Sequence, residues 1–293
     1  RGAGPAGCGV AAAAAERGHD VELFEASPEI GGQFNIAKKV PGKEEFHETL
    51  RYFRRQLELR GVTLHLNTRA DVARLAGGGF DEIVLATGVT PRRPDIEGVG
   101  HARVMGYLDV LRDGKPVGAS VAVIGAGGIG FDVSEYLTHT GESASVAPST
   151  FYAQWGIDVD YGARGGVRMP HVEAAPRNVH LLQRKASKVG DGLGKTTGWI
   201  HRTSLKARRV AMSSGVSYER IDDAGLHVRI DGEPRTLAVD NVVVCAGQEP
   251  QRELYDGLRA AGCSVHLIGG AHVAAELDAK RAILQGTTLA ASI

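Results

Sequence analysis

Gly2-Ala3-Gly4-Pro5-Ala6-Gly7 and Gly125-Ala126-Gly127-Gly128-Ile129-Gly130 are two copies of one turn, and they decide the fold of this chain. The first copy leads into an alanine-rich helical stretch, and the second joins an apolar strand at 120–124 to a helix. Glycines at this spacing permit a tight turn and let the backbone approach a pyrophosphate at the helix N-terminus. The sequence therefore predicts two dinucleotide-binding sites.

The segments around the two turns follow the same order of elements. Strands are predicted at 21–25, 62–67, 82–86, 120–124, 179–183, 242–246 and 265–268, with a hairpin at 217–231. Helices are predicted at 5–17, 44–60, from 128 to about 137, 199–209 and 274–291, whereas 92–118 reads as irregular. Strands that alternate with helices of this length indicate parallel sheets of the doubly wound class. The expected fold is α/β with two Rossmann-like dinucleotide-binding domains.

The ends of the strands that follow the two turns differ in charge. Glu25 ends the first such strand, where a carboxylate can accept hydrogen bonds from an adenosine ribose. The second strand ends in Gln183 followed by Arg184 and Lys185, cations that suit a ribose 2′-phosphate. We therefore expect NADPH rather than NADH at the second turn. A purely structural glycine turn and a solvated basic edge remain the respective alternatives.

Two further motifs point to a flavin at the first turn. Gly31-Gly32-Gln33 adds a second glycine-rich loop soon after the first strand, and Ala86-Thr87-Gly88 ends a later strand. Both resemble motifs that flavoproteins with two dinucleotides place beside FAD, although the first can also be read as an ordinary turn. The cofactor-binding candidates are Gly2, Gly4, Ala6, Gly7, Glu25, Gly32, Gln33, Lys43, Ala70, Thr87, Gly88, Gly125, Gly127, Gly130, Arg184 and Lys185.

These assignments predict how the chain divides. We expect an FAD-binding domain made of 1–115 and 255–293, and an NADPH-binding domain at 116–254 with an insertion at 141–178. The aromatic residues of the insertion favour a docking or gating role, and a satellite cluster packed on its own domain is the open alternative. The first glycine turn has no strand ahead of it, so we expect that strand to be truncated and the retention of FAD to depend on it.

Composition excludes several functions. Lys+Arg and Asp+Glu both number 34, so nothing favours a nucleic-acid or anionic-membrane partner. No apolar run approaches the length of a membrane span, no secretory signal is legible, and a cytoplasmic location is expected. Cys8, Cys245 and Cys263 form no CxxC or CxxxxC pair, so neither a metal site nor a redox-active disulfide is predicted.

Several blocks resemble the bacterial NADPH-dependent 2,4-dienoyl-CoA reductase family over essentially the whole chain, which matches that enzyme's C-terminal half. The blocks are Gly31-Gly32-Gln33-Phe34-Asn35-Ile36-Ala37-Lys38, Pro41-Gly42-Lys43-Glu44-Glu45-Phe46, Tyr107-Leu108-Asp109-Val110-Leu111-Arg112, Leu182-Gln183-Arg184-Lys185-Ala186-Ser187-Lys188 and Gly194-Lys195-Thr196-Thr197-Gly198-Trp199-Ile200-His201-Arg202.

The resemblance implies a route for electrons and roles for single residues. Electrons would pass from NADPH to FAD, then through a [4Fe–4S] cluster and FMN in an N-terminal half to 2,4-dienoyl-CoA, a substrate of fatty acid β-oxidation. It implies that Ala6 lines the FAD pyrophosphate turn, that Gln33 and Lys43 contact the flavin nucleotide, and that Ala70 meets the adenine through its backbone. No catalytic residue of the substrate reaction can be named.

Two rival functions remain open at this stage. A relative similar to trimethylamine dehydrogenase would hold only ADP in a structural role, and a non-catalytic scaffold would carry degenerate nucleotide sites. A flavin spectrum that NADPH bleaches would separate both rivals from the reductase.

Overall fold

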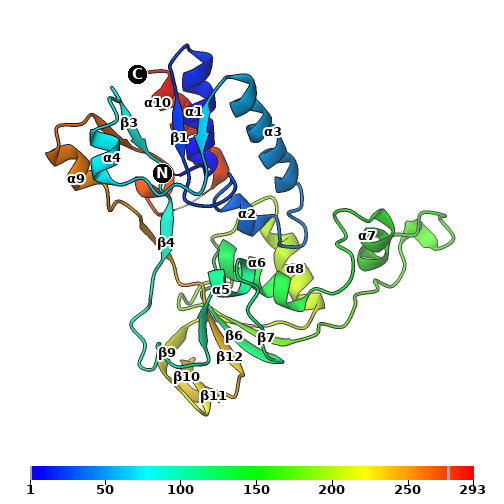
Figure 1. The fold of residues 1–293 in the computed structure, drawn as a ribbon. Coiled ribbons are helices and arrows are strands. Elements are labelled where there is room, and N and C mark those ends of the chain that lie inside the picture. The colour runs from blue at the N-terminus through cyan, green and yellow to red at the C-terminus, as the bar shows by residue number, and fades with distance from the viewer. Residues whose placement is uncertain (1, 276–277) are drawn as a thin grey trace. The chain divides into compact units, whose positions relative to one another are not determined.

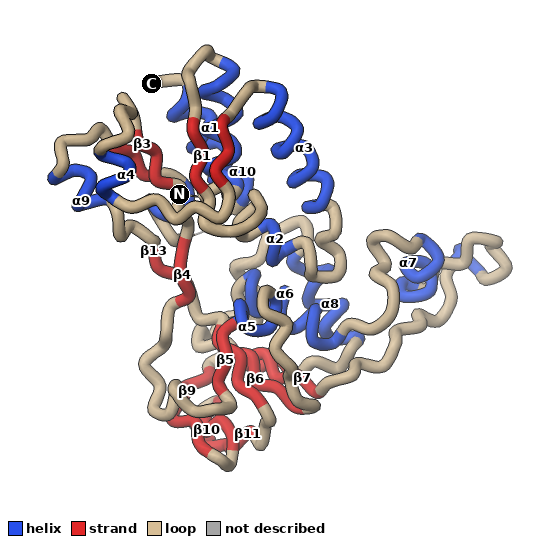
Figure 2. The backbone as a smooth tube through the Cα atoms, in the orientation of Figure 1, coloured by secondary structure: helices blue, strands red, loops and turns tan. Residues whose placement is uncertain are grey.

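The computed structural model describes residues 2–275 and 278–293, and the chain divides into two compact units. Unit 1 comprises Arg1–Asn35, Glu45–Pro91 and Gln248–Ile293. Unit 2 comprises Ile36–Glu44 and Arg92–Gly247. Figure 1 labels the elements where there is room, and Figure 2 distinguishes helices from strands by colour. Which nucleotide each unit binds stays a prediction.

Unit 1 is built from short parallel strand pairs covered by helices. Strand β1 pairs with β2, and β3 pairs with β14, both in parallel, while β4 and β13 pair antiparallel where the chain passes to and from unit 2. The elements are α1 (Pro5–Glu16), β1 (Glu22–Phe24), α2 (Phe34–Ala37), α3 (Phe46–Leu59), β2 (Thr63–His65), α4 (Val72–Ala76), β3 (Ile83–Leu85), β4 (Val89–Pro91), β13 (Gln248–Pro250), α9 (Tyr255–Ala260), β14 (Val265–Leu267), a 3-10 turn (Gly269–Ala271) and α10 (Ala279–Ala290).

Helix α3 illustrates why these segments fold as they do. Its buried side chains Leu50, Phe53 and Leu57 recur at helical spacing and pack in one core cluster with Leu23 and Ile30. The opposite face carries ion pairs spaced three residues apart, Arg51–Glu48 and Arg55–Glu58. An amphipathic helix of this kind is held by burial of its apolar stripe, so its sequence pattern was sufficient to predict it.

Unit 2 contains a five-stranded parallel sheet in the order β5-β12-β6-β7-β8 and an antiparallel sheet in the order β11-β10-β9. The elements are β5 (Val104–Gly106), α5 (Tyr107–Leu111), β6 (Ser120–Ile124), α6 (Gly128–Thr138), α7 (Pro148–Trp155), a 3-10 turn (Arg164–Gly166), β7 (Asn178–Leu182), α8 (Gly198–Ala207), β8 (Ala211–Ser213), β9 (Val216–Asp222), β10 (Gly225–Ile230), β11 (Glu233–Leu237) and β12 (Asn241–Val244). The predicted α/β class with parallel sheets is confirmed.

Three predictions of local structure were wrong or incomplete. The segment 92–118 is not irregular throughout, because it contains β5, which pairs with β12, and α5. The N-cap of α5 is Gly106, whose N–H donates to the Asp109 carboxylate at 2.7 Å. The predicted hairpin gains a third strand, β11, which is polar and mostly exposed. The closing helix begins at Ala279 rather than 274, and residues 276–277 of that prediction lie outside the described part. Short elements carry too little periodicity to be read from sequence.

The insertion 141–178 contains helix α7, none of whose residues is buried. Phe151 and Tyr152 are 41% and 37% exposed, and the Trp155 ring meets the edge of Trp199 on α8 at a centroid distance of 6.2 Å. This ring contact joins the insertion to its own unit, and the aromatic side chains beside it stay partly exposed. The docking role remains a prediction.

Candidate functional site

The two glycine turns share one construction that excludes side chains. A Cβ added at Gly7 would collide with the carbonyl oxygen of Gly2, and one added at Gly130 would collide with that of Gly125. The first glycine of each turn also lies against the backbone at the end of a neighbouring strand, at Ala86 in unit 1 and at Cys245 in unit 2. Close approach of backbone to backbone therefore requires glycine at these positions.

The helix that follows each turn begins without a side-chain cap. Gly4 is the N-cap of α1 and Gly127 is the N-cap of α6, with nearly the same backbone angles (φ −75°, ψ −174° and φ −82°, ψ −172°). Neither helix has an acidic residue in its first turn. Their first N–H groups thus meet no carboxylate or hydroxyl of a capping residue, which fits a phosphate at each helix N-terminus.

Glu25 lies directly after β1 and faces the first turn. Its carboxylate accepts hydrogen bonds from the backbone N–H of Ala3 at 2.8 Å and of Ser27 at 2.9 Å, and also from the Ser27 hydroxyl. A carboxylate has about four acceptor positions, so capacity for a ribose hydroxyl remains. The structure places Glu25 at the turn, and its contact with a ribose stays a prediction. The role of Ser27 in orienting the carboxylate was missed.

The predicted flavin loop lies against the first turn. The N–H of Gly31 donates to the Ala3 carbonyl at 2.7 Å, and a Cβ on Gly32 would come within 3.0 Å of the Gly4 Cα. Gly31 and Gly32 both have positive φ, at 127° and 50°. Gln33 follows with an exposed side chain. The two glycine loops therefore form one cradle of backbone, as a pyrophosphate site needs.

The remaining predicted flavin contacts of unit 1, Ala6, Ala70, Thr87 and Gly88, lie in different surroundings. Ala6 packs beneath the turn against Gly269 and Gly286, and Ala70 is buried in the core just before α4, so it offers only its backbone. The Thr87 hydroxyl donates to the carbonyl of Gln251, whose N–H donates to Gly88 at 3.0 Å. These bonds tie the end of β3 to the segment after β13.

Lys43 belongs to the segment of unit 2 that precedes α3. Its ammonium forms an ion pair with Asp132 of α6 at 2.7 Å, and the two side chains are 31% and 18% exposed. The partner was not foreseen, because nothing in the sequence pattern links the two positions. A flavin contact by Lys43 stays a prediction.

The second turn is flanked by the basic strand end. Residues 184–188 follow β7 and are exposed, and the turn at 125–130 follows the neighbouring strand β6. Carboxyl ends of adjacent parallel strands meet at one edge of a sheet, which is where a dinucleotide binds. The predicted proximity of the turn and the cations follows from this register.

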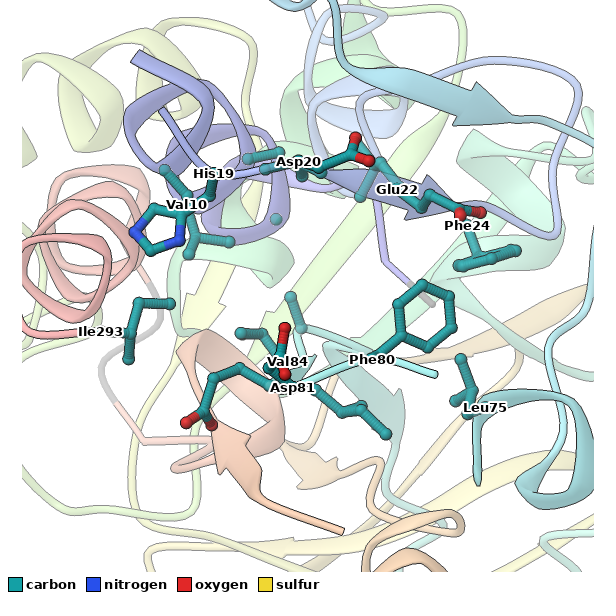
Figure 3. Close-up of a pocket in the computed structure, with 18 of the residues that line it drawn as sticks. Val10, His19, Asp20, Glu22, Phe24, Leu75, Phe80, Asp81, Val84 and Ile293 are labelled. Carbon is teal, nitrogen blue, oxygen red and sulfur yellow. The ribbon is translucent and has the colours of Figure 1, made fainter. Parts of the chain in front are cut away.

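A cavity of about 420 Å³ lies in unit 1 between β1 and β3, alongside α1 (Figure 3). It is lined by both strands, by Val10, Ala11 and Ala14 of α1, and by the exposed residues His19, Asp20, Asp81 and Glu82. The carboxylates of Asp20, Asp81 and Glu82 disfavour an anionic nucleotide. In the described residues, β1 and β3 belong to separate two-stranded sheets, β1-β2 and β14-β3.

The three cysteines are free thiols. Burial, with a smaller effect from the Glu25 carboxylate, raises the pKa of Cys8 to about 12, and burial also raises the pKa of Cys245. Neither is a thiolate at neutral pH, and neither is paired, so they offer no disulfide exchange chemistry. Among the described residues, no group of three or more His, Cys, Asp and Glu side chains is placed to hold a metal ion.

Residues 2–281 match the family described as pyridine nucleotide-disulphide oxidoreductase. The chain belongs to this family. It is an FAD- and NAD(P)H-dependent flavoprotein oxidoreductase module of that type, although its own cysteines form no disulfide. No helix within the described ranges is long and apolar enough to cross a membrane.

Individual relatives match most or all of this chain and are themselves longer. An NADH oxidase of Thermoanaerobacter brockii is 34% identical over 79% of this chain and 37% of its own length. A metal reductase of Desulforamulus reducens is 26% identical over 92% of this chain and 40% of its own. A solved 2-naphthoyl-CoA reductase is 26% identical with a TM-score of 0.82, over 100% of this chain and 39% of that one. The chain thus spans about two fifths of the length of such relatives.

Proposed function

We propose that this chain passes reducing equivalents from NADPH to FAD within a longer enzyme of the 2,4-dienoyl-CoA reductase type. The observation that carries the proposal is the contrast between the two nucleotide turns. The first has an oriented carboxylate, Glu25, at the ribose position, whereas the second has exposed Arg184 and Lys185 there. One turn therefore suits an unphosphorylated ribose and the other a 2′-phosphate.

The residues of the chain would bind and orient the two nucleotides. The uncapped N-termini of α1 and α6 would hold the pyrophosphates, and Glu25 would hold the FAD ribose. Bound FAD supplies the chemistry, because it can accept a hydride and release electrons one or two at a time. The three cysteines are free, and Cys8 and Cys245 are also buried, which favours an exit for electrons other than a disulfide of this chain.

The onward route and the substrate come from outside this chain. We propose that the remaining part of the enzyme carries FMN and a [4Fe–4S] cluster and reduces a 2,4-dienoyl-CoA thioester. The greater length of the relatives leaves room for such a part, and the names 2-naphthoyl-CoA reductase and cinnamate reductase place reductions of conjugated acyl compounds among proteins similar to this one. The relative from Thermoanaerobacter brockii is named an NADH oxidase, which describes the nucleotide of that protein. In this chain the basic residues after β7 favour NADPH.

The test is an anaerobic titration of the FAD-loaded protein with NADPH and NADH, followed by the visible flavin absorbance. NADPH is expected to bleach the flavin at lower concentration than NADH. R184A/K185A should weaken NADPH binding by roughly 10- to 100-fold, because each lost charge-assisted bond is worth at most roughly 1.5–3 kcal/mol and exposed cations contribute less than that maximum. R54A/R55A on the exposed face of α3 is the control.

The outcomes separate the rivals. A flavin that binds but is not bleached by either nucleotide would contradict the reductase and favour a structural role for the nucleotide sites. Bleaching with no preference between NADPH and NADH, unchanged in R184A/K185A, would contradict the assignment of the cations alone.

A further inference from the structure

One side chain organises the basic loop that follows β7. The amide nitrogen of Gln183 donates to the carbonyl of Ser187 at 2.7 Å and of Lys185 at 3.1 Å, and the N–H of Gly190 donates to its amide oxygen at 3.1 Å. The Ser187 hydroxyl and the Lys188 carbonyl lie within 3.4 Å of the same nitrogen. A single half-buried glutamine thus holds the backbone at both ends of residues 184–190.

The far end of this loop is fixed to the helix that begins at the second glycine turn. Gly190 has a φ of 73°, and a Cβ there would lie 2.6 Å from the ring of Phe131 on α6. The Arg202 guanidinium of α8 donates to the Gly190 carbonyl at 2.9 Å. The loop is therefore held between β7, α6 and α8, next to the nucleotide turn.

The near end is fixed by backbone bonds to the segment after β8. Val216 donates to the Gln183 carbonyl and Gly215 donates to the Lys185 carbonyl, both at 3.0 Å. The Lys185 and Ser187 carbonyls thus accept hydrogen bonds from within unit 2, while the cationic side chains of the loop are exposed. Arg184, Lys185 and Lys188 are all exposed, and within the described residues none of them forms an ion pair with a carboxylate.

We propose that Gln183 is a positioning residue for the nucleotide 2′-phosphate, which acts by holding the 184–190 loop in its binding conformation. The inference rests on the proposed preference for NADPH and deepens it. A loop that is ordered before binding loses less conformational freedom when the phosphate arrives, so its cations bind more tightly. Gln183 need not touch the nucleotide at all.

The decisive variant is Q183M, which keeps the length and burial of the side chain but removes its hydrogen bonds. Calorimetry with adenosine 2′,5′-bisphosphate and with 5′-AMP measures the contribution of the 2′-phosphate without flavin or turnover. Q183M should weaken the bisphosphate about tenfold and change 5′-AMP by less than twofold. In the FAD-loaded protein it should raise the KM for NADPH while kcat at saturation stays unchanged.

Controls separate positioning from general damage. Gln285 also binds a backbone N–H, that of Gly269 at 2.8 Å in unit 1, so Q285M should leave the ratio of the two nucleotide affinities unchanged. If Q183M fails to fold, Q183E serves in its place. It retains the acceptor for Gly190 and loses both donated bonds, and its negative charge should weaken the bisphosphate further.

The comparison with R184A/K185A distinguishes two kinds of failure. An unchanged affinity ratio in folded Q183M, together with a reduced ratio in R184A/K185A, would overturn the role of Gln183 and leave the preference for NADPH standing. An unchanged ratio in both variants would overturn the preference itself, and with it the inference.

Discussion

The second nucleotide turn requires glycine at position 130, because the backbone there packs against Gly125. A Cβ there would collide with the Gly125 carbonyl, which is backbone and cannot move aside cheaply. Two positions earlier, Gly128 lies at the start of α6 with no atom within 4 Å of an added Cβ. The two glycines therefore form a matched pair in one turn.

We expect Gly130→Ala to lower the free energy of unfolding by about 1–3 kcal/mol, the usual cost of overpacking. Gly128→Ala should be neutral or slightly stabilising, because alanine favours a helix more than glycine does by about 1 kcal/mol. Denaturant titration of both variants measures the difference. Equal stability of the two would contradict the close packing of this turn.

At the scale of elements, strand β7 carries a half-buried histidine inside the parallel sheet. His180 pairs in register with Ala122 of β6 and Ala211 of β8. Burial lowers its pKa below the ordinary value. The unfolded chain, whose histidine titrates near ~6.5, therefore binds a proton at a pH where the folded chain does not.

It follows that His180 reduces stability as the pH falls below about 6.5. His180→Gln should flatten this part of the stability curve relative to the wild-type protein. Urea unfolding between pH 5 and 8 gives both curves, and their difference removes the contribution of the other histidines. Parallel curves for the two proteins would refute the effect.

At the scale of the whole molecule, the chain contains two nucleotide sites and neither a metal cluster among its described residues nor a cysteine pair. We expect it to transfer electrons from NADPH through added FAD to ferricyanide. It should not reduce a 2,4-dienoyl-CoA, because that reaction also needs a proton donor placed at the substrate. Stopped-flow measurements with ferricyanide and with 2,4-dienoyl-CoA as acceptors test both parts of this prediction. Turnover of the thioester by this chain alone would contradict its role as a reductase module.

Much of the fold and of the site could be predicted because their signals are local. A glycine required by a neighbouring carbonyl, the amphipathic α3 and the apolar β6 are each specified by residues close in sequence. Glu25 likewise lies only one strand after its turn. Local steric limits and periodicity are legible in one dimension. The two turns, the α/β class and the basic end of β7 were therefore determined by the sequence itself.

Other features depended on the tertiary structure, because they join residues that no pattern connects. Lys43 forms an ion pair with Asp132, and the Thr87 hydroxyl donates a hydrogen bond to the Gln251 carbonyl. Strand β5 is defined by its pairing with β12. Gln183 was visible as a strand end, but its hold on the 184–190 loop required the path of the backbone. Such contacts arise only when the packed core brings distant segments together, so their partners could be named only from the folded chain.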